Sequence, residues 1–436
     1  MAQPRRRGNG GARPAVVGLR ATGFHQEITA MAFNPLQEKG IPMDRQLRNW
    51  RELNMQPYDT KAVHPYTRCR VIAMNGIEVE SVMFGHQFHR HCADMDIKRQ
   101  LAMVRRIEQQ QQKAVSALVP GEESTLEVTI GYEQVAVDLT AWVAQSEPDS
   151  YAKQTYEFGL LEDFDHLYRY ANLLDLTSPR KAAELVGQLT EITPGRPTFM
   201  EHRHPYDDVR KPLSKNGNPL SLMHAMTITA AEQQTMNFYM NMANRFVEPV
   251  ARGLYTEIAE IEEQHVTQYG SLLPPDCSWA EMLVQHEYNE CYMYWSMMQN
   301  EDDARLKQLW ELHLNFEIEH LRHACELMKK IDKSDPEAML PKELPEPVKF
   351  QSNKDYVRRV LGAQLNLTAK ETDFVAMDSL DKGFRYFGYR DAVNGNEPSP
   401  TEAIINQHRE AQGSDYRLET EGPHPIDWLR QQQAAE

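Results

Sequence analysis

Acidic residues and histidines recur at fixed intervals within the helix-forming stretch of residues 223–330. Glu262 and His265 form a Glu-x-x-His motif, and Glu317 and His320 form a second one. Residues three apart are neighbours on one face of an α-helix, so each motif presents a carboxylate and an imidazole together. The two motifs therefore indicate two helices, each with a pair of polar side chains on one face.

The spacing of two other glutamates predicts how these helices are connected. Glu232 precedes Glu262 by 30 residues, and Glu287 precedes Glu317 by the same interval. An antiparallel pair of helices returns to the same height only when its turn lies midway. A Glu-Pro pair lies at the first midpoint and an Asn-Glu-Asp-Asp run at the second, and both favour the start of a helix. The stretch is therefore predicted to form two helical hairpins.

Four helices that supply Glu, Glu-x-x-His, Glu and Glu-x-x-His to one interior form a cage for two metal ions. A single Glu-x-x-His motif is usually just solvated surface, but two motifs preceded by glutamates at the same interval are not explained in this way. Carboxylates at matched heights in a bundle core are costly to bury unless cations compensate them. The predicted metal ligands are Glu232, Glu262, His265, Glu287, Glu317 and His320.

The pattern resembles that of the ferritin-like di-iron carboxylate proteins, and rubrerythrin in particular. Residues 231–234 with Tyr239 resemble the first ligand helix of that family, and residues 287–290 resemble the third. The resemblance implies that the two lone glutamates are terminal ligands, that the glutamate of each motif bridges the metals, and that each motif histidine holds one metal. It also implies that Glu290 is a further, mobile ligand.

Two tyrosines follow the predicted ligands at equal distance. Tyr239 and Tyr294 each lie seven residues after a lone glutamate, two turns along the same helix face. With Glu290 they are the candidate catalytic residues. The alternative interpretation is that both tyrosines are hydrogen-bonded residues of the core.

The four-helix pattern occurs twice, at a constant offset of 154 residues. Ser124 and Glu127 match the capping box of Ser278 and Glu281 at this offset. The chain is therefore interpreted as a tandem duplication of one four-helix unit. The counterparts of the six predicted ligands are, in order, Glu78, Glu108, Gln111, Glu133, Asp163 and His166.

The first copy has diverged at its site. Gln111 replaces a histidine, and a neutral amide is a poorer ligand for iron or manganese than an imidazole. Asp163 is one methylene shorter than its counterpart, and Ala136 stands where the second copy has Glu290. The first copy is interpreted as a scaffold that packs against the working copy, with weak or single-metal binding as the alternative.

The predicted fold is all-α, with two tandem ferritin-like four-helix bundles and extended arms. The predicted parts are an N-terminal arm, partly disordered (1–70), a degenerate bundle (71–176), a linker (177–220), a bundle with the dinuclear site (221–331) and a C-terminal arm (332–436). Short helices are expected near residues 180–190, 355–365 and 401–412. The run of residues 201–204, Glu-His-Arg-His, is interpreted as solvated surface because its linker is rich in proline.

Composition narrows the class of protein. A net charge of −16 argues against nucleic acid as a main partner. The sequence lacks an apolar run long enough to span a bilayer, so a soluble protein without a membrane partner is expected. Five cysteines without a Cys-x-x-Cys motif favour a reducing cytoplasm. The long arms are compatible with a homodimer.

The expected function is that of a non-haem dinuclear oxidoreductase that activates O2 or H2O2. Carboxylates and imidazoles suit iron or manganese, so the expected cofactor is a pair of iron ions, or manganese with iron. Rubrerythrins usually carry a four-cysteine iron domain, which this sequence lacks, so an external electron donor is expected. Whether an organic substrate takes part is left open. The alternatives are a ferroxidase or iron-handling protein, and an interaction protein with a relic metal site.

Overall fold

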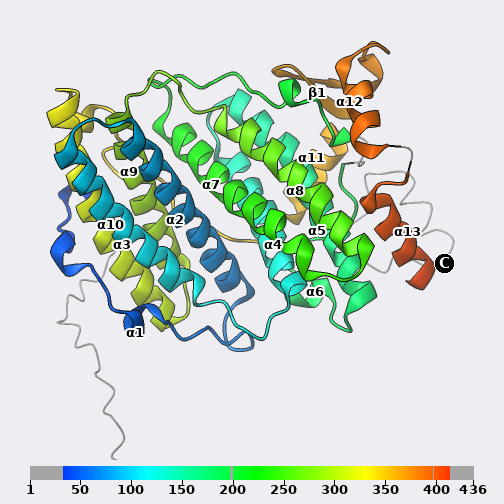
Figure 1. Ribbon diagram of the computed structural model, residues 1–436, viewed down its shortest axis with the longest axis horizontal. Helices are drawn as coiled ribbons and strands as arrows, with labels where there is room; N and C mark the ends of the chain where they lie inside the picture. Colours follow the sequence, from blue (N-terminus) through cyan, green and yellow to red (C-terminus); the bar gives the residue numbers. More distant parts are fainter. Residues whose placement is uncertain (1–32, 197–199, 396, 413–436) are drawn as a thin grey trace, which may run out of the picture. The chain divides into compact units, whose positions relative to one another are not determined.

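The computed structural model describes residues 33–196, 200–395 and 397–412. These residues are mostly helical, in agreement with the predicted all-α class (Figure 1). The α-helices are α1 (Trp50–Leu53), α2 (Pro65–His91), α3 (Met95–Ser116), α4 (Thr125–Ser146), α5 (Ser150–Thr177), α6 (Ala182–Leu185), α7 (Pro219–Met242), α8 (Pro249–Gly270), α9 (Trp279–Asn300), α10 (Ala304–Ile331), α11 (Lys354–Gln364), α12 (Arg385–Asn394) and α13 (Pro400–Gln412). The strands are β1 (Leu367–Lys370) and β2 (Asp373–Ala376), and the short 3-10 helices are η1 (Pro35–Gln37), η2 (Met43–Arg45), η4 (Pro205–Asp207), η5 (Ala243–Arg245), η6 (Pro336–Ala338) and η7 (Met377–Ser379).

Eight long helices form four antiparallel hairpins whose turns lie where the spacing predicts them. Asp94, Asp149 and Asp303 cap the second helix of three hairpins by accepting hydrogen bonds from first-turn N–H groups. In the remaining hairpin, α7–α8, Pro249 occupies the first turn of the second helix. The two predicted capping boxes are both formed, at the starts of α4 and α9. Local sequence therefore determines the length and the ends of each hairpin.

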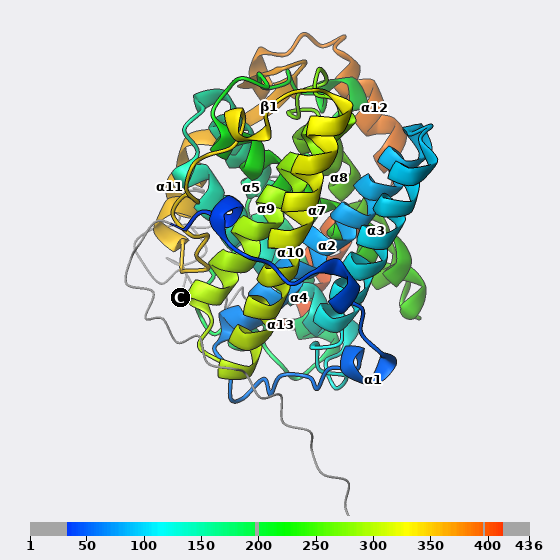
Figure 2. The same cartoon turned by 90° about the vertical axis from the view of Figure 1, so that its left-hand side faces the viewer.

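The hairpins associate in an order that the sequence repeat does not suggest. The α2–α3 hairpin packs against α9–α10, and we call these four helices the first group. The α4–α5 hairpin packs against α7–α8, and these form the second group. The two groups lie on opposite sides of Figure 1, and Figure 2 is turned so that the first group faces the viewer.

Each group thus contains one hairpin from each copy of the repeat. The predicted division into a bundle of residues 71–176 and a bundle of residues 221–331 does not correspond to these groups. The chain passes from the first group to the second between α3 and α4, and it returns between α8 and α9. The described residues from Asn34 onward form one compact unit.

Helices α2 and α7 are in contact where the two groups meet. Gln234 on α7 donates a hydrogen bond to the carbonyl of Ile72 at 2.7 Å and accepts one from Asn75 at 2.8 Å. Gly76 allows this approach, because a Cβ atom there would lie 2.7 Å from the Gln234 amide nitrogen. A side chain at position 76 would therefore displace the Gln234 amide from this contact and come within 3.1 Å of the carbonyl of Ala230.

The segments outside the hairpins cover the two groups. Helices α11 and α13, both predicted from the sequence, pack on α5, and α13 also contacts α8. Only a short helix, α6, forms in the region predicted to be helical near residues 180–190. The parts of the predicted arms that comprise residues 1–32 and 413–436 lie outside the described residues.

The β1–β2 hairpin is an addition to the predicted all-α fold. Its strands are antiparallel, and Lys370 pairs with Asp373 at the turn, where Glu371 has a positive φ of 56°. Phe374 stacks on Phe158 of α5 with ring centroids 4.0 Å apart. The hairpin thus depends on a contact distant in sequence. Among the described residues, no helix has both the length and the apolar character needed to cross a bilayer.

Candidate metal centres

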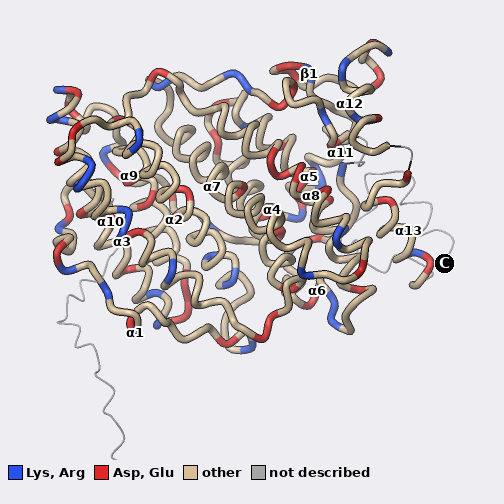
Figure 3. The backbone as a smooth tube through the Cα atoms, in the orientation of Figure 1, with Lys and Arg blue, Asp and Glu red and all other residues tan. Residues whose placement is uncertain are grey.

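Buried carboxylates and histidines converge inside both helical groups. Figure 3 marks acidic positions along the helices as well as on the loops. The first centre, inside the first group, consists of Glu78, Glu108, Glu287, Glu290, Glu317 and His320. The second centre, inside the second group, consists of Glu133, Asp163, His166, Glu232, Glu262 and His265. Each of these twelve residues is at most 2% exposed.

The ligand set predicted for one centre is therefore divided between two. Glu232, Glu262 and His265 lie in the second centre. The remaining predicted ligands, Glu287, Glu290, Glu317 and His320, lie in the first. Residues of the first copy complete both centres, which contradicts its interpretation as a scaffold with a separate, degenerate site.

The second centre contains two overlapping ligand positions. One is formed by Asp163, Glu232, Glu262 and His265, and the other by Glu133, His166 and Glu262; within each set the ligand atoms lie within 4.8 Å of one another. Glu262 belongs to both sets. A carboxylate shared in this way is suited to bridge two cations, and its neighbours supply ligands to each side.

His265 is oriented with one nitrogen toward the carboxylates and the other away from them. Its Nδ1 lies 3.2 Å from Oδ1 of Asp163 and 3.2 Å from Oε2 of Glu262. Its Nε2 lies 2.8 Å from Oε2 of Glu162, outside the centre. A second acceptor on the far nitrogen is the usual way in which a protein fixes a metal-binding imidazole. Nδ1 is therefore the candidate ligand atom.

His166 has the same orientation. Its Nδ1 lies 3.1 Å from Oε1 of Glu262, and its Nε2 faces Glu201 at 4.0 Å. Arg169 contacts Glu201 at 2.7 Å and also pairs with Asp165. Burial, then Arg169 and the neighbouring His265, hold the pKa of His166 well below its usual value, so this imidazole is neutral, as a metal ligand must be.

A layer of buried ion pairs supports the second centre from outside. Arg203 pairs with Glu162, and Arg196 lies 3.4 Å from the same carboxylate. Burial opposes ionisation of Glu162, but Arg203, His265 and Arg196 outweigh it and lower its pKa to about 2. Glu162 is therefore a permanent acceptor for His265.

This layer corrects one prediction. The prediction places residues 201–204 on the solvated surface, but Glu201, His202 and Arg203 are 0%, 5% and 1% exposed. Glu201 faces His166, and Arg203 pairs with Glu162. The proline-rich composition of the linker did not indicate burial, because the segment is held by ion pairs with α5 rather than by apolar side chains.

The electrostatics of the second centre fit bound cations. Burial and the neighbouring Glu232 raise the pKa of Asp163 to about 7, and burial and Glu232 raise that of Glu262 well above its usual value. Within the described part of the chain, Nδ1 of His265 is the one polar group that faces the carboxylates of Asp163 and Glu232, and their other oxygens have no hydrogen-bond partner. Buried, unpaired oxygens of this kind are costly unless they bind a cation. Four carboxylates and two neutral imidazoles balance the charge of two divalent ions.

The first centre repeats part of this geometry. His320 Nδ1 lies 2.9 Å from Oε2 of Glu317 and 3.8 Å from Oε2 of Glu287, while its Nε2 lies 2.8 Å from Oε1 of Gln46. Burial raises the pKa of Glu108 to about 7. One candidate position comprises Glu108, Glu287 and His320, and the other comprises Glu78, Glu290 and Glu317.

The two candidate catalytic tyrosines lie in different centres. Tyr239, in the second group, donates a hydrogen bond to Oε1 of Glu133. Tyr294, in the first group, donates to Oε1 of Glu78 and lies 3.0 Å from Nδ1 of His313. Both tyrosines are fully buried. Each tyrosine therefore binds one carboxylate oxygen of a candidate ligand. The other oxygen, Oε2 of Glu133 or of Glu78, has no hydrogen-bond partner among the described residues and can face the centre.

Sequence reasoning missed two supporting segments, each of which crosses the last long helix of one copy of the repeat. Gly40 approaches α10 so closely that a Cβ there would lie 2.8 Å from the carbonyl of Asn315. Gly195 approaches α5 in the same way, at 2.4 Å from the carbonyl of Leu161, which is the repeat counterpart of Asn315. A signal exists in the sequence, because the Gly-x-Pro triplets that begin at residues 40 and 195 are related by an offset of 155.

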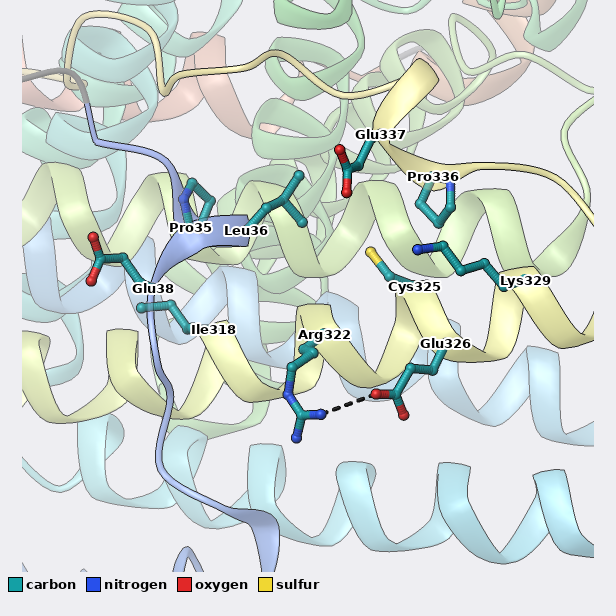
Figure 4. Close-up of a pocket in the computed structure, with 10 residues that line it drawn as sticks. All are labelled: Pro35, Leu36, Glu38, Ile318, Arg322, Cys325, Glu326, Lys329, Pro336 and Glu337. Atoms are coloured by element: carbon teal, nitrogen blue, oxygen red, sulfur yellow. Dashed lines mark hydrogen bonds and ion pairs between the residues drawn. The ribbon is translucent and has the colours of Figure 1, made fainter.

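The first of these segments, residues 34–46, is called the N-terminal strap below. Pro35 and Leu36 of the strap lie beside Cys325 of α10 in a pocket of about 180 Å³ (Figure 4). The same offset of 155 relates Gln46 to Glu201. Each of these two residues faces the Nε2 atom of a candidate ligand histidine at the end of its segment.

Comparison of the chain with protein-family models, with curated proteins and with solved structures finds no match.

Proposed function

We propose that this chain is a non-haem dinuclear metal oxidoreductase of the ferritin-like type, in which the second centre activates O2 or H2O2. On this proposal the two helical groups are two ferritin-like bundles that have exchanged hairpins. The observation that carries the proposal is the second centre itself. Its six candidate ligands are buried and follow the order Glu, Asp-x-x-His, Glu, Glu-x-x-His on four successive long helices, with Glu262 common to both positions.

Two iron ions, or manganese with iron, held by these residues would supply one electron each to O2 or H2O2. The chain itself supplies binding and orientation. Glu162 holds the His265 imidazole through Nε2, and Glu201 lies 4.0 Å from Nε2 of His166, so that Nδ1 of each histidine faces the carboxylates. Tyr239 holds one oxygen of Glu133 and leaves the other, which is buried and has no described partner, for a cation.

The metal-free chain can hold protons where cations would bind. Burial opposes the charged form of His265, but Asp163, Glu162 and Glu232 together raise its pKa well above the usual value. A divalent cation would replace this proton between His265 and the carboxylates. Cation binding to the second centre therefore releases protons.

The test compares Glu262→Gln with Glu263→Gln. These neighbours lie on α8, but Glu262 is shared by both positions of the second centre, whereas Glu263 is exposed. The expected result is that Glu262→Gln loses the metals of the second centre and the reductant-dependent consumption of O2 or H2O2, while Glu263→Gln keeps both. Metal content is measured by elemental analysis of protein reconstituted anaerobically with Fe²⁺ alone.

Several outcomes would contradict the proposal. Equal metal content in the two variants would remove the second centre as a metal site. If Glu262→Gln loses metal but the wild type itself consumes neither O2 nor H2O2, the oxidoreductase function would be excluded. Multiple turnovers of Fe²⁺ to Fe³⁺ without a reductant would assign the centre to iron oxidation and handling instead.

A further inference from the structure

We propose that the first centre is a second, chemically different metal site, in which the position formed by Glu78, Glu290 and Glu317 binds through oxygen alone and takes a hard divalent cation of the Mn²⁺ class. The inference rests on the proposed function only in using the second centre as its reference. It concerns a site that the sequence did not predict as a unit, because its ligands come from α2, α9 and α10.

The first observation is the match between the two centres. The repeat offset relates Glu78 to Glu232 and Glu317 to Asp163. In the second centre, the Nδ1 atom of His265 faces the carboxylates of Asp163 and Glu232. In the first centre, Nε2 of Gln111 donates to Glu78 at 3.2 Å and also to Glu317. Gln111 therefore occupies the place of an imidazole ligand.

The second observation is that a carboxylate has been gained where the imidazole is lost. Glu290 is 2% exposed, and neither of its oxygens has a hydrogen-bond partner within the described residues. Its repeat counterpart in the second centre is Ala136. The first centre thus combines an amide with an added carboxylate, whereas the second combines His265 with an alanine.

Gln111 can contribute an oxygen to a bound cation. Its Oε1 is buried and has no hydrogen-bond partner among the described residues. Without a cation, the amide NH2 group lies between two carboxylates, where positive charge is favoured. With a cation bound to Glu78 and Glu317, rotation of the amide directs Oε1 toward it, because the two ends of an amide have similar shapes.

The donor atoms then determine the selectivity. Carboxylate and carbonyl oxygens suit Mn²⁺ and other hard cations, whereas imidazole favours iron and later metals. The Glu78 position has no imidazole, while each position in the second centre has one. Fe²⁺ generally binds more tightly than Mn²⁺ at any one site, so the informative quantity is the ratio of manganese to iron at each centre.

The experiment uses the full chain, stripped of metal and reloaded anaerobically with equimolar Mn²⁺ and Fe²⁺. Elemental analysis gives metals per chain, and electron paramagnetic resonance detects bound Mn²⁺. Glu262→Gln removes the metals of the second centre, so that the metals that remain belong to the first. We expect the Glu262→Gln variant to hold a higher ratio of manganese to iron than the wild type. We expect the Glu290→Ala variant to lose manganese.

Two exchange variants provide the matched control. Gln111→His with Glu290→Ala gives the first centre the donor set of the second, and it is expected to lower the ratio of manganese to iron. His265→Gln with Ala136→Glu makes the reverse change in the second centre, and it is expected to raise the ratio. Thermal melting of the metal-free variants, followed by circular dichroism, shows whether each one folds.

The outcomes separate this inference from the proposed function. If folded Glu290→Ala keeps all of its manganese, or if the first exchange variant keeps the wild-type ratio, the inference is overturned. It is also overturned if Glu262→Gln holds no metal. If Glu262→Gln loses nothing, the proposed function fails while the result for Glu290→Ala still decides the first centre.

Discussion

Gln46 provides a test of how the N-terminal strap supports the first centre. Its side chain is 1% exposed, and its Oε1 lies 2.8 Å from Nε2 of His320. Its own Nε2 donates to the carbonyl of Ile41 at 2.6 Å and is 3.5 Å from that of Phe316. With the amide fixed in this way, Oε1 can only accept, so Nε2 of His320 carries a hydrogen. Nδ1 donates to Oε2 of Glu317 in the metal-free chain, and it is the nitrogen that a cation would take.

The perturbation is Gln46→Ala. Loss of the outer partner of a ligating histidine typically weakens metal binding by about 10–100-fold. This corresponds to about 1.4–2.8 kcal/mol of binding free energy. The lost backbone hydrogen bond to Ile41 costs a further ~1 kcal/mol of stability, which affects the metal-free protein as well. If Gln46 positions His320, Gln46→Ala is therefore expected to lose more free energy of metal binding than free energy of unfolding of the metal-free protein.

The assay is a metal titration against a competing chelator, performed in the Glu262→Gln background so that the first centre is measured alone. Gln46→Glu is the informative second variant, since Glu201 is the repeat counterpart in the second centre. A carboxylate there keeps the acceptor, and we expect binding within a few-fold of the parent, or tighter. Leu47→Ala, at a side chain 46% exposed, is the control. Unchanged affinity in a folded Gln46→Ala protein would refute the assignment of Gln46 as a positioning residue.

Two further predictions test the division into two centres and the charge state of the ligands. Glu262→Gln and Glu317→Gln are expected to remove different metals, so their losses add in the double variant; a double variant that loses no more than one single variant would place both residues in one centre. The raised pKa values of Asp163 and Glu108, about 7 each, mean that the folded metal-free chain retains protons that the unfolded chain releases. This contribution to stability is therefore present at low pH and lost as the pH rises from about 4 through 7. Melting temperatures with a chelator should fall from pH 5 to pH 8, and added Fe²⁺ or Mn²⁺ should reverse the fall; a chelated protein that becomes more stable over that range would contradict the assignment.

Features fixed by nearby residues were accessible from the sequence. The turn before Pro249 and the capping boxes at Ser124 and Ser278 form as predicted, because a cap or a turn depends on residues within a few positions. The residues that line the candidate centres could also be located in the sequence, since each Glu-x-x-His motif lies on a single helix. All six predicted ligands are buried in a candidate centre.

The partner of each hairpin was not accessible in the same way. Both copies present equivalent glutamates at equivalent heights, so pairing within a copy and pairing between copies satisfy the same pattern. Contacts such as that of Tyr294 with Glu78, from α9 to α2, decide between them, and this one joins residues more than 200 positions apart. A repeat identifies interchangeable units, but it does not identify their partners.

Pairing between copies changes the meaning of the divergence between them. Under pairing within copies, Gln111 would face Ala136, and that centre would lack both a histidine and the added carboxylate. In the observed pairing, Gln111 shares a centre with Glu290, so a carboxylate is present where an imidazole is missing. Ala136 accordingly lies in the group where His265 is kept. The substitutions therefore do not mark one decayed copy; they divide the chain into two candidate centres, each with six candidate ligands and with different donor atoms.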